Sequence, residues 1–141
     1  MPDSGFTNKA EAKNLLVKGL KEGTWLEFED SVYQVTNDVA APYYMLAVYK
    51  DNEYWNVTRR YYKSGKLFTY YPFKNGKLDG VEKWYYESGN IQYTIPFTNG
   101  KVNGTKTEYY ENGKVKTETT WSNDLITGPA KQYDENGKEI K

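Results

Sequence analysis

The stretch FTNGKVNGTKTEYYENGKV, from Phe97 to Val115, contains three Asn-Gly pairs and one Tyr-Tyr pair. Two further Asn-Gly pairs, Asn75-Gly76 and Asn136-Gly137, lie elsewhere in the chain. Asn-Gly between apolar residues is a strong hairpin signal, because both residues tolerate the positive φ angles of a tight turn. The stretch therefore predicts hairpin turns rather than a ligand-binding loop or a chemically reactive site.

The same pattern recurs along the chain with a period of 24 residues. Tyr-Tyr occupies positions 61–62, 85–86 and 109–110, and Gly occupies positions 65, 89, 113 and 137. A recurring period of this size indicates stacked repeats with atypical end units. We expect an N-terminal tail, partly disordered or a short helix, and then one repeat domain. The tail is residues 1–16, the domain is 17–141, and its units lie near 17–49, 50–73, 74–97, 98–121 and 122–141, with extra residues within 30–42.

Each unit has two runs rich in Tyr, Thr, Val and Ile that are separated by Gly-containing turns, which is typical of a hairpin. A two-residue loop at Ser88-Gly89 would pair Tyr85 with Gln92. A three-residue loop at 87–89, with Gly in the left-handed position, would pair Tyr85 with Ile91. The equivalent pairs of the neighbouring units are then apolar as well, so the three-residue loop is favoured.

Asn75-Gly76 and Asn99-Gly100 are predicted to be two-residue type I′ turns between units. Keeping Leu78 and Val81 on one face then requires a slip of one residue at Gly80; the alternative is one wider turn over 78–80. The predicted fold is all-β, an elongated antiparallel meander of tandem β-hairpin repeats. Its inner face is expected to carry Val57, Tyr61, Leu67, Tyr71, Phe73, Val81, Tyr85, Ile91, Tyr93, Ile95, Phe97, Tyr109, Val115 and Trp121.

Composition excludes several classes of chemistry. The chain has no His and no Cys, which removes the commonest general base, thiolate ligands and disulfides. We therefore expect no enzyme, no catalytic residues, no metal and no cofactor. Charge is balanced, with 19 Lys and Arg against 19 Asp and Glu, which argues against nucleic acid and against an anionic membrane surface. No signal peptide is visible, so a cytoplasmic protein is expected, with export after signal removal as the alternative.

The pattern Asn-Gly-Lys-x-x-Gly-x-x-x-x-Tyr-Tyr-x-x-Gly-Lys resembles the MORN repeat, in the variant form of bacterial proteins. Residues 98–114 match it closely and 74–90 nearly as well, whereas Asn56 and Asp134 depart from it in the outer units. The resemblance implies a run of antiparallel hairpins and a role in protein interaction or as a scaffold. It also implies, for bacterial variants, antitoxin or immunity proteins of toxin–antitoxin systems.

The outer face of the predicted hairpins is aromatic toward the N-terminal units. It carries the candidate partner-binding residues Arg60, Tyr62, Phe68, Tyr70, Trp84, Tyr86 and Tyr110. One interpretation is that the insertion within 30–42, or residues 1–16, folds over these aromatics. The other is a partner-binding patch, because exposed aromatics with Arg form interface hot spots.

The favoured function is a non-enzymatic protein-binding module, more narrowly an antitoxin or immunity protein that blocks a partner toxin. A glycan- or cell-wall-binding aromatic repeat protein and a membrane-associated scaffold are the alternatives. The expected partner is another protein. The two edges of an open sheet leave both a monomer and an edge-paired homodimer open.

Overall fold

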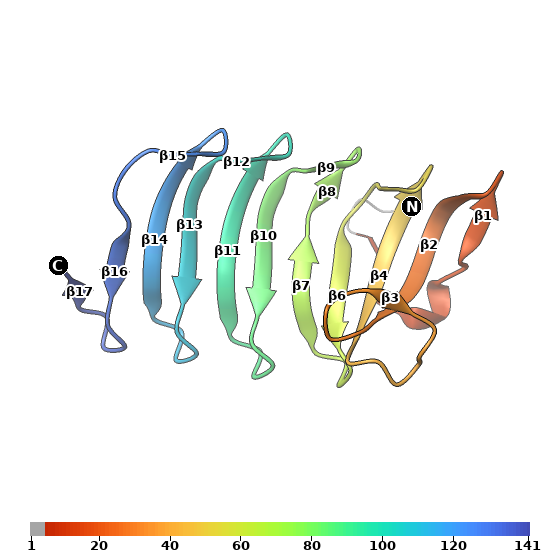
Figure 1. Cartoon of the computed structure of the whole chain (residues 1–141), viewed down its shortest axis with the longest axis horizontal. Coiled ribbons are helices and arrows are strands. Elements are labelled where there is room, and N and C mark those ends of the chain that lie inside the picture. The colour runs from red at the N-terminus through yellow and green to blue at the C-terminus, as the bar shows by residue number, and fades with distance from the viewer. Residues whose placement is uncertain (1–4) are drawn as a thin grey trace. The chain divides into compact units, whose positions relative to one another are not determined.

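The computed structural model describes residues 5–141, which form antiparallel strands joined by hairpins, with one 3-10 turn (Figure 1). The predicted all-β antiparallel meander of consecutive hairpins is confirmed. The chain divides into two compact units between Lys77 and Leu78.

In the first unit, strands lie in the order β1-β2-β4-β6-β7, with β3 on β2 and β5 on β4. The N-terminal segment forms η1, whose first turn is capped by the Asn8 side chain accepting from Ala10 N at 3.0 Å. Residues 1–4 of the predicted tail lie outside the described residues. The elements are η1 (Lys9–Glu11), β1 (Leu15–Val17), β2 (Leu20–Glu29), β3 (Val35–Thr36), β4 (Tyr43–Lys50), β5 (Glu53–Tyr54), β6 (Thr58–Tyr62), β7 (Leu67–Tyr71) and β8 (Phe73–Lys74).

In the second unit, strands lie in the order β10-β11-β13-β14-β16-β17, with β12 on β11 and β15 on β14. β9 (Lys77–Leu78) leads into this unit. The remaining elements are β10 (Gly80–Tyr85), β11 (Ile91–Thr98), β12 (Lys101–Val102), β13 (Gly104–Tyr109), β14 (Val115–Ser122), β15 (Leu125–Ile126), β16 (Lys131–Tyr133) and β17 (Glu139–Ile140).

The hairpin loops within the repeats have three residues, as predicted. Tyr86 N donates to Asn90 O at 2.8 Å, and Gly89 N donates to Tyr86 O at 2.9 Å. Gly89 has φ +96°, a left-handed conformation that glycine adopts without steric cost. The same two hydrogen bonds close the loops that contain Gly65, Gly113 and Gly137.

The turns between repeats are also as predicted. Asn99 and Gly100 have φ values of +51° and +80°, and Phe97 pairs with Val102 across them. The register then shifts by two residues rather than one, because Thr94 pairs with Thr107 farther along the same strand. The predicted one-residue slip is therefore wrong in this copy: Val102 and Thr105 lie on opposite faces.

A bulge after the three-residue loops that contain Gly65, Gly89 and Gly113 was not predicted, and it reverses the faces. Tyr85 pairs with Ile91, but the preceding residue, Trp84, pairs with Tyr93, so Gln92 is the extra residue. The other two copies have the same shift, with Phe68 and Lys116 as the bulged residues. The main register of the strands is thus the one that a two-residue loop would give, whereas only the loop end keeps the three-residue register.

The predicted inner face is wrong for this reason. In the second unit the sheet has a Trp84 face and a Tyr85 face, and the predicted residues are divided between them. The Trp84 face carries Glu82, Trp84, Tyr93, Ile95, Phe97, Lys106, Glu108, Thr117, Thr119 and Trp121. The Tyr85 face carries Val81, Lys83, Tyr85, Ile91, Thr94, Thr107, Tyr109, Val115 and Glu118.

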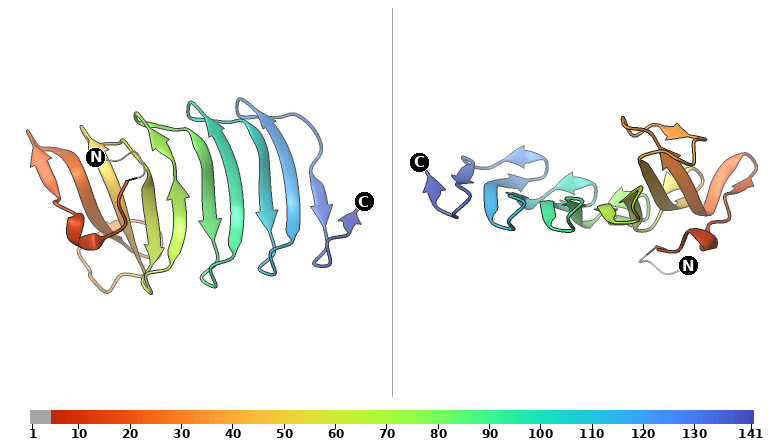
Figure 2. Two further views of the ribbon diagram at one scale, coloured as in Figure 1. Left: turned by 180° about the vertical axis from the view of Figure 1, so that it is seen from behind. Right: turned by 90° about the horizontal axis from the view of Figure 1, so that it is seen from below.

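Among the described residues, the buried hydrophobic side chains lie in the first unit. One cluster, around Tyr44, Leu46 and Tyr61, is covered by Phe6 from the N-terminal segment. A second cluster, Met45, Ala47 and Tyr49, lies on the opposite face. Figure 2 shows η1 on one side of this sheet and the segment that contains β3 on the other. Both faces of the first unit are therefore covered by the chain itself.

Candidate functional site

Arg60 is held by a buried ion pair on one face of the first unit. Its Nε lies 2.5 Å from Glu29 Oε2, and its Nη1 donates to the Tyr71 hydroxyl at 2.8 Å. The two charged side chains are 11% and 4% exposed. Burial lowers the pKa of Arg60, but hydrogen bonding to Glu29 and the nearby charges outweigh this and raise the pKa overall. Arg60 therefore stays charged and is already occupied.

The insertion covers this face with an aromatic cluster. The Tyr33 ring lies 4.7 Å from the Arg60 guanidinium and 5.2 Å from the Tyr43 ring. Phe68 stacks on Tyr62 with ring centroids 4.6 Å apart, and Phe68 is 6% exposed. Through Tyr33, segment 30–42 thus lies over two of the predicted partner-binding residues, Arg60 and Phe68, and a third, Tyr62, stacks against Phe68.

A second buried carboxylate lies on the same face. Glu27 accepts a short hydrogen bond from the Tyr49 hydroxyl and pairs with Lys21 Nζ at 2.6 Å. Burial, followed by the hydrogen bond to Glu27, raises the pKa of Tyr49 well above its ordinary value. Each carboxylate of this cluster therefore has a cation or hydroxyl from its own unit, and the cluster stabilises the fold rather than forming an open reactive site.

Tyr70 lies on the other face of the first unit. It pairs with Arg59, whereas Arg60 pairs with Thr69, and adjacent strand residues point to opposite sides. The Arg59 guanidinium lies 5.4 Å from the Tyr70 ring, and its Nη1 donates to Phe6 O at 3.5 Å. The prediction that all seven candidate residues share one outer face is therefore wrong for Tyr70.

Tyr86 and Tyr110 join one hairpin to the next. The Tyr86 hydroxyl donates to Tyr109 O at 2.8 Å, and the Tyr110 hydroxyl donates to Tyr133 O at 2.8 Å. In the last copy Asp134 replaces this Tyr, and its Oδ1 accepts from Asn136 N and Lys138 N, both at 2.9 Å. The second Tyr of the pair thus has a structural role that explains its recurrence.

Trp84 is half-buried on the Trp84 face of the second unit. The same face carries residues that were not predicted as a site. Trp84 Nε1 donates to Glu82 Oε1 at 2.6 Å. On the same face, a hollow of about 290 Å³ is lined by Tyr93, Lys106, Glu108, Thr117, Thr119 and Trp121.

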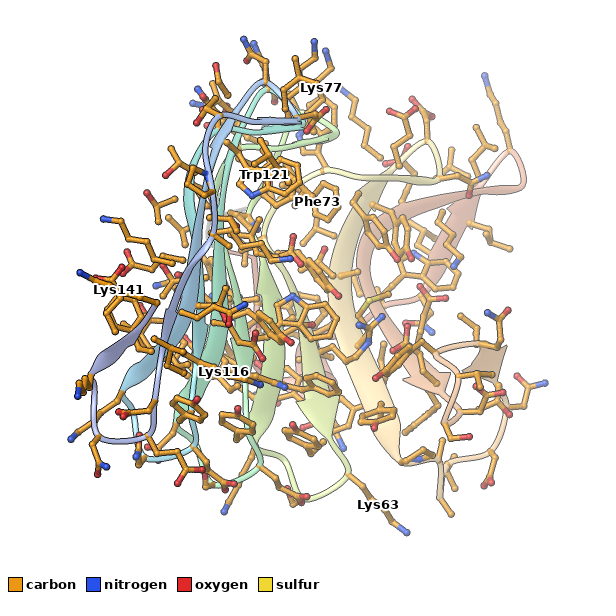
Figure 3. All side chains as sticks on the ribbon, turned by 60° about the vertical axis from the view of Figure 1, so that its left-hand side comes forward. Lys63, Phe73, Lys77, Lys116, Trp121 and Lys141 are labelled. Atoms are coloured by element: carbon orange, nitrogen blue, oxygen red, sulfur yellow. The ribbon has the colours of Figure 1, made fainter. Side chains whose placement is uncertain are left out.

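The charges of this hollow are arranged around Glu108. Lys116 Nζ lies 3.0 Å from Glu108 Oε1, and the Tyr93 hydroxyl lies 3.4 Å from the same oxygen. The pKa of Tyr93 is raised by burial and by the Glu108 charge. Lys106 Nζ lies 5.8 Å from the Tyr93 ring centroid. Figure 3 shows Lys116 and Trp121 projecting from β14 on the same side of the sheet.

The alternation of residues along each strand predicts the face on which these residues lie, but only when the bulge is known. An alternation carried straight through Gln92 places Tyr93 on the inner face, and one carried straight through Lys116 places Trp121 there. Once the bulge is included, the alternation places Tyr93, Glu108 and Trp121 on one face. The bulged positions hold Phe, Gln and Lys, which share no property that would reveal a bulge.

The repeats also match a known family. The profile of the MORN repeat variant matches residues 56–75, 78–99, 102–123 and 126–138, which is more than half of the chain. The chain belongs to the MORN repeat variant family. The irregular segment before Asn56, which includes β2 and β4, lies outside these matches. A search of curated proteins gave no match.

MORN repeats are generally non-enzymatic modules that often mediate binding. Residues 5–141 contain no cluster of carboxylates suited to hold a metal ion. No helix within the described part of the chain is long and apolar enough to cross a membrane.

Proposed function

We propose that this MORN-repeat protein is a protein-binding module and that the Trp84 face of the second unit is the surface that binds the partner. The observation that carries this proposal is a difference between equivalent faces. Segment 30–42 covers the Arg60 face of the first unit, whereas the hollow around Glu108 in the second unit has no such cover from residues 78–141.

The chemistry of the Trp84 face supports a protein partner. Trp and Tyr supply large, rigid contact areas, and such residues dominate the binding energy of protein interfaces. Trp84, Tyr93 and Trp121 are half-buried, so their rings are oriented by the sheet but still partly exposed. Charged residues between them, Lys106 and Glu108, provide selectivity for charge. This combination suits a folded partner better than a small apolar ligand.

A narrower form of the proposal concerns the class of partner. Bacterial proteins with variant MORN repeats, which this chain resembles, include antitoxin and immunity proteins. We propose that the chain covers the active surface of a toxin and blocks it. A rigid sheet suits this task because its side chains lose little conformational freedom on binding.

Co-expression with the product of the neighbouring gene tests both forms. The narrow form predicts that the chain forms a complex with that product and suppresses its toxicity, and that Trp121→Ala weakens both effects. Removing a central aromatic anchor typically costs at least about 2 kcal/mol, or about thirtyfold in affinity.

The matched control is Val81→Ala, which shortens an exposed side chain on the Tyr85 face. It should leave affinity and rescue unchanged. Complex formation without rescue would reject the antitoxin role but keep the binding module. Equal loss in the two variants, with both still folded by circular dichroism, would reject the assignment of the Trp84 face.

A further inference from the structure

The hollow on the Trp84 face contains a cation without a counter-charge. Lys106 is half-exposed on β13, and its amine lies 5.8 Å from the Tyr93 ring centroid. Within residues 5–141, three ion pairs form, and none of them includes Lys106. An ammonium held beside an aromatic ring and an open hollow attracts an anionic group from outside the chain.

The neighbouring carboxylate is already engaged. Glu108 pairs with Lys116 at 3.0 Å and lies 3.4 Å from the Tyr93 hydroxyl. The ion pair with Glu108 raises the pKa of Lys116, so Lys116 stays protonated. Around the hollow, the Trp84 face holds two cations, Lys106 and Lys116, and two carboxylates, Glu82 and Glu108. Glu82 accepts from Trp84 Nε1 and Glu108 pairs with Lys116, so Lys106 is the cation that no ion pair within residues 5–141 includes.

The first unit shows how a cation on the corresponding face is satisfied, although Arg60 occupies the repeat position of Glu108 rather than that of Lys106. There Arg60 receives a carboxylate, Glu29, from β2, and an aromatic ring, Tyr33, from the insertion. The second unit provides a cation together with the rings of Tyr93 and Trp121, but no carboxylate for Lys106. The missing group in the second unit is thus an acidic side chain.

We propose that the hollow lined by Tyr93, Lys106 and Trp121 binds an Asp or Glu side chain of the partner protein, with an adjoining aromatic residue of the partner against Trp121. This proposal rests on the proposed protein-binding function and adds the chemistry of the segment that is bound. The Thr117 and Thr119 hydroxyls line the same hollow, on the strand that pairs with the Lys106 strand, and can donate hydrogen bonds to the same carboxylate.

A protein carboxylate fits the hollow better than a nucleic acid phosphate. The chain has equal numbers of basic and acidic residues, so it lacks the basic excess that typically binds a phosphate backbone. Glu108, which also lines the hollow, would repel a doubly charged phosphate more strongly than a carboxylate. A single Asp or Glu side chain matches the single ammonium group of Lys106.

Three synthetic peptides test the proposal with the full chain. They are identical except for one central residue after a Trp: Glu, Gln or Lys. Binding is followed by the shifts of backbone amide signals in β13 and β14 in ¹H–¹⁵N NMR spectra. We expect the Glu peptide to bind at least about tenfold more tightly than the Gln peptide, the equivalent of about 1.4 kcal/mol, and the Lys peptide to bind most weakly.

Two charge reversals locate the effect. Lys106→Glu should abolish the preference for Glu and favour the Lys peptide. Lys131→Glu is the matched control, because Lys131 pairs with Glu118 on the Tyr85 face and is exposed. It should change no peptide affinity by more than about twofold. Lys106→Gln introduces no repulsion, so it should remove the preference for the Glu peptide without favouring the Lys peptide. It also shows whether an effect of Lys106→Glu comes from the lost charge rather than from misfolding.

The outcomes separate this inference from the proposed function. Equal binding of the three peptides, or no effect of Lys106→Glu, would reject the acidic occupant while leaving a protein-binding face that Trp121→Ala still weakens. Inorganic phosphate that shifts the same amides as strongly as the Glu peptide would also reject it, in favour of a general anion site. Absence of any shift at millimolar peptide would reject it outright.

Discussion

Replacing Arg60 with Met should destabilise the first unit strongly, because it leaves the Glu29 carboxylate buried without its cation. Glu29 is 3% exposed, and Arg60 binds both of its oxygens, with Nη2 donating to Oε1 at 3.2 Å. Breaking a buried ion pair by removing one partner costs about 3–5 kcal/mol. Since the Arg60 side chain is still 11% exposed, we expect the lower end, about 3 kcal/mol.

Urea unfolding measures this cost. With a slope of about 2 kcal/mol/M for a chain of this size, a loss of about 3 kcal/mol lowers the midpoint by about 1.5 M. Because the two compact units need not unfold together, hydrogen exchange of amides in β4 and β6 should report the loss, and amides in β13 and β14 should not.

Two further variants separate the buried charge from simple loss of packing. Lys116→Met breaks the exposed ion pair with Glu108, whose side chains are 45% and 25% exposed, and should cost no more than about 1 kcal/mol. Glu29→Leu combined with Arg60→Met removes both charges and should recover most of the stability. If Arg60→Met costs no more than Lys116→Met, or if the double variant is no better than the single, the buried charge is not the cause.

Three other predictions concern the backbone, the tyrosines and the insertion. Gly104→Ala should lower the free energy of unfolding by about 3 kcal/mol, because φ is +123° and an added Cβ would lie 2.9 Å from Pro96 Cγ. Gly113→Ala, with open space around the added Cβ, should lower it by only about 1 kcal/mol, and thermal unfolding of both variants measures the difference. Burial raises the pKa of Tyr49 above that of an unfolded Tyr. The stability from this group should therefore be complete below about pH 10 and fall above it by about 1.4 kcal/mol per pH unit. Urea midpoints measured against pH should show this slope, and Tyr49→Phe should reduce it. Tyr33→Ala should destabilise the first unit by about 1–2 kcal/mol through lost ring contacts, speed hydrogen exchange in β6 and β7, and leave partner binding at the Trp84 face unchanged.

Turn chemistry made the architecture predictable from the sequence. Asn-Gly demands positive φ at both positions, and Asn99 and Gly100 adopt it. The glycine of each three-residue loop is equally demanding, so the loops at Gly65, Gly89 and Gly113 could be placed from the spacing of the residues alone. These are local requirements of the backbone, and they depend little on what packs around them.

The faces of the sheet could not be predicted in the same way, because one extra residue reverses them. The consistent pairing of Tyr85 with Ile91 is real, but it holds only at the loop end, and beyond Gln92 the strand returns to the other register. The cover over Arg60 was one of two interpretations of the outer face, and the sequence could not decide between them for a different reason. Segment 30–42 breaks the period, so no other repeat contains an equivalent from which the position of Tyr33 could be inferred.

The repeat position occupied by Arg60 forms a column along the sheet, and the residue type in this column differs from one repeat to the next. Binding should reside where the residue type varies in this way. The equivalent residues, 24 apart, are Arg60, Trp84, Glu108 and Gln132, whereas the loop glycines of the same repeats do not change. Invariant positions satisfy the backbone, so they cannot distinguish one partner from another. The variable column is fixed in position by that backbone, and each of its members can differ without loss of the fold. In the first unit the chain itself neutralises the column, through Glu29 and Tyr33. In the second unit, residues 78–141 supply no such cover, and Lys106 lies on the same face, two residues before the column member Glu108. The charge on Lys106, rather than the more conspicuous aromatics of the first unit, should therefore decide which partner binds.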